Sequence, residues 1–133
     1  MKREMIETTL APAGIGVYSQ AVKVGDLVFI SGQIPLDPKT QQVVEGSFEQ
    51  SVRQVFHNLK MICEAAGGGL HDIVKLNVYL ADLSTCSILN EIMAEYFQKP
   101  YPARAVVEVS RLPKDVMVEV DAVMVIQRGE EKS

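Results

Sequence analysis

The segment 116–127, VMVEVDAVMVIQ, constrains the fold of this chain more than any other stretch. Successive side chains of an extended strand point to opposite faces. One face of this segment would carry Val116, Val118, Val120, Met124 and Ile126. The other face would carry Met117, Val123 and Val125. Apolar residues on both faces indicate burial on both faces. The segment is therefore predicted to be an internal strand with protein on each side of it.

Two helices are predicted from apolar residues at spacings of three and four. In the first, Ser47 and Gln50 form a capping-box start, Gly67 to Gly69 ends it, and the apolar positions are Phe48, Val52, Val55, Leu59, Ile62 and Ala66. The second runs from about Ser87 to Gln98 and ends before Pro100 and Pro102. Its expected buried stripe is Ile88, Ile92 and Tyr96.

Strands are expected at 5–8, 20–24, 27–31, 73–80, 103–110 and 116–127. A tight turn at Gly25-Asp26 joins the second and third, and 32–46 is expected to be a surface loop. This order predicts an α+β domain, a mixed sheet with two helices on one face. Two helices cannot cover both faces of a sheet, so another copy of the chain is expected to cover the second face. The alternative is a set of scattered exposed valines.

Length and charge bound the class of protein. A chain of 133 residues predicts one domain, residues 1–133. The net charge of −4 argues against a dedicated nucleic-acid binder, which needs a basic face to displace counterions. The charged first ten residues lack the apolar stretch of a secretory signal, and the apolar run 122–126 is too short to span a bilayer. A cytoplasmic protein in a reducing compartment is expected.

Metal ligands and nucleophiles are sparse. His57 and His71 lie fourteen positions apart without a cysteine or carboxylate at ligand-like spacing, so no metal site is expected and both histidines should be solvated. Cys63 and Cys86 form no C-x-x-C pair, and packing is a better interpretation of each than nucleophilic chemistry.

Arg104 and Glu119 are charged residues within apolar strands. Burying an isolated charge is costly, so each should have a partner or face a cavity. One interpretation is a structural ion pair between the two, which the local sequence favours slightly. The other is an anion-binding cleft, because the guanidinium fork of arginine matches a carboxylate bidentately.

Several blocks of the sequence resemble the Rid superfamily. The segment PARAVVEVSRLPKDVMVEV (102–120) is similar to its C-terminal signature, an arginine followed by a glutamate-bearing strand. APAGIGVYSQAV (11–22) is similar to its N-terminal loop and FISGQIPLDPKT (29–40) to its SGQIP segment. DIVKLNVYLADL (72–83) resembles its central strand, and Asn90 falls where the family has an asparagine in the second helix.

The resemblance implies a chorismate-mutase-like fold that forms a homotrimer, with three clefts between adjacent subunits. Members of the RidA branch hydrolyse 2-iminobutanoate and 2-iminopropanoate, released by pyridoxal-phosphate enzymes, to 2-keto acids and ammonia. The expected ligand is thus a small imino or keto acid, with no metal or organic cofactor and no membrane or nucleic-acid partner. The alternatives are a translation-inhibiting endoribonuclease and a non-catalytic ligand-binding trimer.

The resemblance also implies roles for individual residues. Arg104 would bind the substrate carboxylate, and Glu119 would place or activate water. The positions that match the lining of the cleft are Tyr18, Ser31, Gly32 and Asn90. Tyr18 would donate a hydrogen bond or serve as an apolar lid.

Three positions depart from the family pattern. Val106 stands where many members have a cysteine, which removes any thiol role but leaves a backbone group to bind the imine nitrogen or water. Val17 replaces a common proline, and Cys86 replaces a common aromatic residue.

Overall fold

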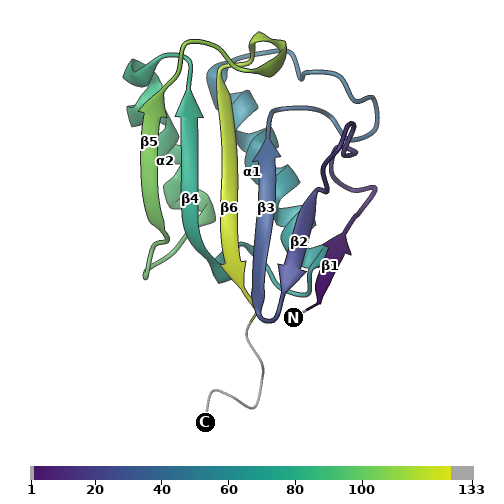
Figure 1. Ribbon diagram of the computed structural model, residues 1–133. Coiled ribbons are helices and arrows are strands. Elements are labelled where there is room, and N and C mark those ends of the chain that lie inside the picture. The colour runs from purple at the N-terminus through teal and green to yellow at the C-terminus, as the bar shows by residue number, and fades with distance from the viewer. Residues whose placement is uncertain (1, 127–133) are drawn as a thin grey trace.

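The computed structural model describes residues 2–126. Within them the elements are β1 (Arg3–Ile6), β2 (Ala21–Val24), β3 (Leu27–Gln33), α1 (Phe48–Ala65), β4 (Ile73–Leu80), α2 (Cys86–Tyr96), β5 (Ala103–Glu108) and β6 (Val118–Val125). Short 3-10 helices lie at η1 (Leu70–Asp72), η2 (Leu83–Thr85) and η3 (Pro113–Asp115). The strand order is β1-β2-β3-β6-β4-β5, and only the β4–β5 pair is parallel. Both helices lie behind one face of this sheet (Figure 1), which confirms the predicted α+β class.

Local sequence signals account for α1. The Ser47 hydroxyl accepts a hydrogen bond from the Gln50 backbone N–H, and the Gln50 side chain accepts one from the Ser47 N–H, so the predicted capping box is present. Most of the predicted apolar stripe is buried, together with Phe56. The Phe56 ring packs against Tyr96 and Phe97, with ring centroids 5.3 and 5.6 Å apart, and so joins α1 to the end of α2.

The buried face of α2 differs from the prediction. Ile88 is 40% exposed, and the buried residues of this helix are Leu89, Ile92 and Met93. The helix covers β4 and the edge strand β5, as Figure 1 shows, and only the narrow side of α2 that faces these strands is buried. Periodicity located the helix but not which side of it faces the sheet.

The alternation in β6 is confirmed. Val118, Val120, Ala122 and Met124 are buried beneath the helices, while the residues between them are half-buried on the open face. The same open face carries Leu27, Phe29 and Val107, which are 41%, 48% and 46% exposed in one chain. The apolar character of both faces is therefore real, and one face has no covering layer within the described chain.

The end of β3 contains an irregularity that matters for the site. Ile30 pairs with Ala122 and Gln33 with Val120, so β3 has one residue more than β6 between these pairs. Ser31 and Gly32 occupy this β-bulge, and Gly32 and Gln33 belong to the strand rather than to the predicted loop. Bulges redirect side chains and are frequent beside functional sites.

No helix in residues 2–126 is long and apolar enough to cross a membrane.

Candidate functional site

A cavity of about 620 Å³ opens beside the bulge of β3. Four residues predicted for the site, Tyr18, Ser31, Gly32 and Glu119, line it. The other lining residues are Pro12, Ala13, Ile15, Gln20, Gln33, Ile34, Leu36, Pro113 and Lys114. The Ser31 hydroxyl donates to the Ser19 carbonyl at 2.6 Å, which ties the bulge to the 11–20 segment. The fold thus gathers residues from both ends of the sequence around one carboxylate.

Gly32 is required by the position of Glu119. A Cβ atom at residue 32 would overlap the Glu119 carboxylate oxygen Oε2 and lie 2.9 Å from its Cδ. Glycine therefore lets the carboxylate rest directly against the backbone of the bulge. The close approach of Glu119 explains the glycine in the SGQIP segment.

Glu119 has an unusual electrostatic environment. Burial raises the pKa of its carboxyl group, and the nearby Asp121 carboxylate raises that pKa further. Asp121 lies two residues along on the same face of β6. It accepts hydrogen bonds from Asn77 Nδ2 at 2.8 Å and Tyr79 Oη at 2.9 Å, both on β4. These two hydrogen bonds fix the position of the Asp121 carboxylate beside Glu119. A raised pKa makes the Glu119 carboxylate a better proton acceptor than an ordinary glutamate.

Lys114 also lines this cavity, and the sequence did not single it out. It lies in η3, where Lys114 and Asp115 both have φ of 56°, the left-handed region that side chains other than glycine rarely adopt. Arg111 holds Asp115 through a 2.7 Å ion pair. Backbone strain of this kind concentrates at functional sites, but no local sequence signal marked it.

Arg104 lines a different cavity, of about 290 Å³, on the helix side of the sheet. Its Nη1 donates to Asn90 Oδ1 at 2.6 Å and to Met93 Sδ at 3.4 Å. Ala94, Phe97, Tyr101 and Pro102 complete the lining. The guanidinium thus combines with neutral and apolar groups, which is the environment expected of an anchor for a small anion.

Arg104 and Glu119 project from opposite faces of the sheet. Arg104 is paired with Leu76, which is buried under the helices, whereas Glu119 is paired with Tyr79 on the open face. The two residues are two strands apart, so the interpretation as an ion pair within one chain is wrong. Local sequence could not reveal this, because the relative position of β5 and β6 depends on β4 between them.

Val106 lines neither of these two cavities. It faces the helix side of β5, half-buried against the core. Apart from Val106, the predicted site residues fall into two groups, one around Glu119 and one around Arg104.

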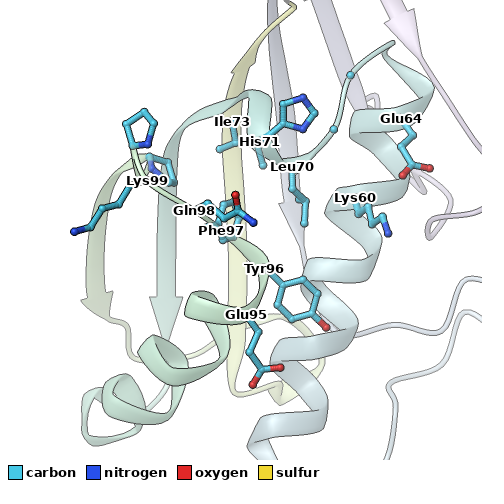
Figure 2. A pocket seen from close by; sticks show the side chains of 14 residues that line it. Lys60, Glu64, Leu70, His71, Ile73, Glu95, Tyr96, Phe97, Gln98 and Lys99 are labelled. Carbon is cyan, nitrogen blue, oxygen red and sulfur yellow. The ribbon is translucent and has the colours of Figure 1, made fainter.

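A third cavity, of about 740 Å³, lies between the C-terminal ends of α1 and α2 (Figure 2). Its lining comes from α1, η1, the end of α2 and the following loop, and includes none of the predicted site residues. Lys60, Glu64, Glu95 and Lys99 place both signs of charge along it. Glu95 is already paired with Arg53 at 2.9 Å. The lining of this cavity therefore favours neither an anionic nor a cationic ligand.

The cysteines and histidines lie outside the two cavities that contain predicted site residues. Cys63 is buried, and burial raises the pKa of its thiol to about 12, which keeps it protonated. Cys86 is half-buried and is a free thiol. His57 and His71 are both exposed. Within the described residues, no group of three or more His, Cys, Asp or Glu side chains is placed to hold a metal ion.

The fold defines a class. An α+β chain with two helices against one face of a six-stranded mixed sheet has the fold of RidA proteins of known structure. Residues 8–126 match the family model described as Endoribonuclease L-PSP. The chain therefore belongs to this family, the Rid family.

Relatives with related names cover nearly the whole chain. A RutC family protein of Pyrococcus horikoshii is 52% identical over 91% of this chain and 96% of its own length. The 2-iminobutanoate/2-iminopropanoate deaminase of Mus musculus is 45% identical over 92% of this chain and 91% of its own. The crystal structure of RidA from the Antarctic bacterium Psychrobacter sp. superimposes with a TM-score of 0.89 at 52% identity, covering 92% of this chain and 99% of that one.

Proposed function

We propose that this protein hydrolyses 2-imino acids, with 2-iminobutanoate and 2-iminopropanoate as substrates, to 2-keto acids and ammonia. One observation carries the proposal: the Arg104 guanidinium lies in a cavity where its side-chain hydrogen bonds go to neutral groups, Asn90 and Met93. Its charge is not neutralised by these partners, so it remains available to a substrate carboxylate. The name of the mouse relative supports the same chemistry.

The reaction requires few protein groups. A protonated imine is electrophilic at C2, and addition of water gives a carbinolamine that expels ammonia. Glu119 would accept one proton from the attacking water and return it to the nitrogen. As the C–N bond breaks, Glu119 would take the proton of the carbinolamine hydroxyl and pass it to the departing ammonia, which yields the 2-keto acid and ammonium. Holding the substrate carboxylate and a water molecule in the correct relative positions accelerates the reaction by proximity and orientation. Proton transfer by Glu119 would accelerate it by about a further 10²–10⁴-fold.

The site also requires a second copy of the chain. Arg104 and Glu119 face opposite sides of the sheet, so one chain does not bring both to one substrate. We propose that Arg104 of one subunit meets the cavity of Tyr18, Ser31, Gly32 and Glu119 of its neighbour in a homotrimer. The apolar open face, including Phe29 and Val107, supplies the surface that such assembly would bury.

A coupled assay tests the activity. Threonine dehydratase and threonine generate 2-iminobutanoate, and semicarbazide traps whatever imine has not been hydrolysed. Added protein is expected to lower the yield of the trapped adduct in proportion to its concentration, and the Arg104→Ala variant should not. An unchanged yield with wild-type protein would contradict the proposal.

The family description names an endoribonuclease, so RNA cleavage is the second candidate. The net charge of −4 and the exposed, separate positions of His57 and His71 do not favour it. The same preparation should be incubated with a folded RNA. RNA cleavage that survives Arg104→Ala, without imine hydrolysis, would favour the nuclease; binding of a 2-keto acid without any turnover would favour a non-catalytic ligand-binding protein.

A further inference from the structure

The contacts of Arg104 are concentrated on one nitrogen. Nη1 donates to both Asn90 Oδ1 and Met93 Sδ, at 2.6 and 3.4 Å. Guanidinium has only donors, so the Asn90 amide must present its oxygen to Arg104, and its Nδ2 group points elsewhere. A carboxylate binds arginine bidentately either across Nη1 and Nη2 or across Nε and Nη2. With Nη1 engaged, the Nε–Nη2 edge is the one left for a ligand.

We propose that Asn90 is a positioning residue, which holds Arg104 so that its Nε–Nη2 edge faces the substrate carboxylate. This inference rests on the proposed function and gives Asn90 a different role from the substrate contact that the family resemblance suggested. Asn90 acts through Arg104 rather than on the substrate.

The chemistry of the holding groups supports this role. Arg104 is exposed on an edge strand, where a long side chain has many rotamers and loses entropy when a ligand fixes it. Asn90 and Met93 lie three residues apart on α2, and therefore on the same side of the helix. Both are neutral acceptors, so they restrict the side chain without neutralising its charge. A carboxylate at position 90 would restrict it equally but would compete with the substrate anion.

A double-mutant cycle tests the proposal, with 2-oxobutanoate binding measured by calorimetry. Asn90→Ala is expected to weaken binding about tenfold or more, because hydrogen bonds to charged groups contribute about 1.5–3 kcal/mol and each tenfold in affinity corresponds to about 1.4 kcal/mol. Asn90→Asp should weaken binding at least as much. In an Arg104→Lys background, Asn90→Ala should change affinity less than about twofold, since the fork on which it acts is gone. Glu91→Gln, the adjacent exposed residue on α2, is the matched control. Equal losses in both backgrounds would show a direct contact with the ligand and overturn the proposal.

A second readout needs no ligand and no activity. The Arg104 side-chain N–H resonances, assigned by comparison with Arg104→Lys, should show restricted rotation in the wild type and free rotation in Asn90→Ala. If the wild type neither binds 2-oxobutanoate nor hydrolyses imines, the proposed function fails, and the resonances alone decide whether Asn90 holds Arg104. Unrestricted Arg104 resonances in the wild type would contradict the positioning role, whatever the activity.

Discussion

Glu119 lies where the charged form of a carboxylate is disfavoured. It is half-buried against a glycine backbone and beside a second carboxylate, that of Asp121. Hydrogen bonds from Asn77 and Tyr79 hold the Asp121 carboxylate in place on the same face of β6, where it raises the pKa of Glu119. At the scale of the single residue, the consequence is a glutamate whose proton is held more tightly than usual. The first two predictions concern that proton.

Removing the charge of Asp121 should lower the pKa of Glu119. Asp121→Asn keeps the size of the side chain but removes the negative charge that disfavours ionisation of Glu119. The acidic limb of the pH profile of kcat should therefore move to lower pH, and the carboxyl resonance of Glu119 should titrate at lower pH. Asp115→Asn, which removes a surface charge paired with Arg111, is the control. A Glu119 titration unchanged by Asp121→Asn would show that burial alone raises the pKa.

Glu119→Gln should lower turnover while raising the stability of the folded protein. The pKa of Glu119 is raised in the folded state, so its contribution to stability is fully present below the unfolded pKa and is lost as pH rises through the folded pKa. A neutral amide of similar shape avoids that loss, and the melting temperature at pH 7 should rise relative to wild type. Turnover should fall by about 10² or more with little change in KM. Unchanged kcat would remove Glu119 from the mechanism.

Elements differ in how far sequence predicts them. The start of α1 follows from Ser47 and Gln50, and Ile73–Leu80 was predicted with its observed bounds, because both depend on neighbours in the chain. The bulge at Ser31 and Gly32 depends on pairing with β6, ninety residues later in the sequence, so the local pattern ended the strand at Ser31 and placed Gly32 in a loop. The split between the Arg104 and Glu119 groups likewise depends on strand order and register.

The bulge gives a prediction at this scale. Gly32→Ala puts a Cβ where the Glu119 carboxylate lies, and the end of a flexible side chain moves more easily than the backbone. The variant should therefore fold with a nearly unchanged melting temperature but lose most of its turnover, because Glu119 is displaced. In a Glu119→Gln background, Gly32→Ala should reduce the remaining rate little further. Full activity in Gly32→Ala would mean that this carboxylate position is not the working one.

For the whole molecule, the open sheet face is the decisive feature. Phe29, Leu27 and Val107 are exposed in one chain, and Val123 and Val125 extend the same apolar surface. Three chains of 14.7 kDa would bury this surface in an assembly of about 44 kDa. Light scattering at micromolar concentration should give that mass, and Phe29→Lys should shift it toward the monomer. A monomeric wild type would leave the apolar face unexplained and the two-subunit site impossible.

Complementation between two inactive variants tests the central claim most directly, namely that each site takes Arg104 from one subunit and Glu119 from the next. Arg104→Ala and Glu119→Gln proteins, each expected to have little or no activity alone, are mixed in equal amounts, dissociated and allowed to reassociate. In randomly mixed trimers about a quarter of the sites combine a wild-type Arg104 with a wild-type Glu119 from the neighbour, so about a quarter of wild-type activity should return. If both residues serve a substrate within one chain, no mixture contains an intact site, and activity that stays at the level of the separate variants would contradict the account.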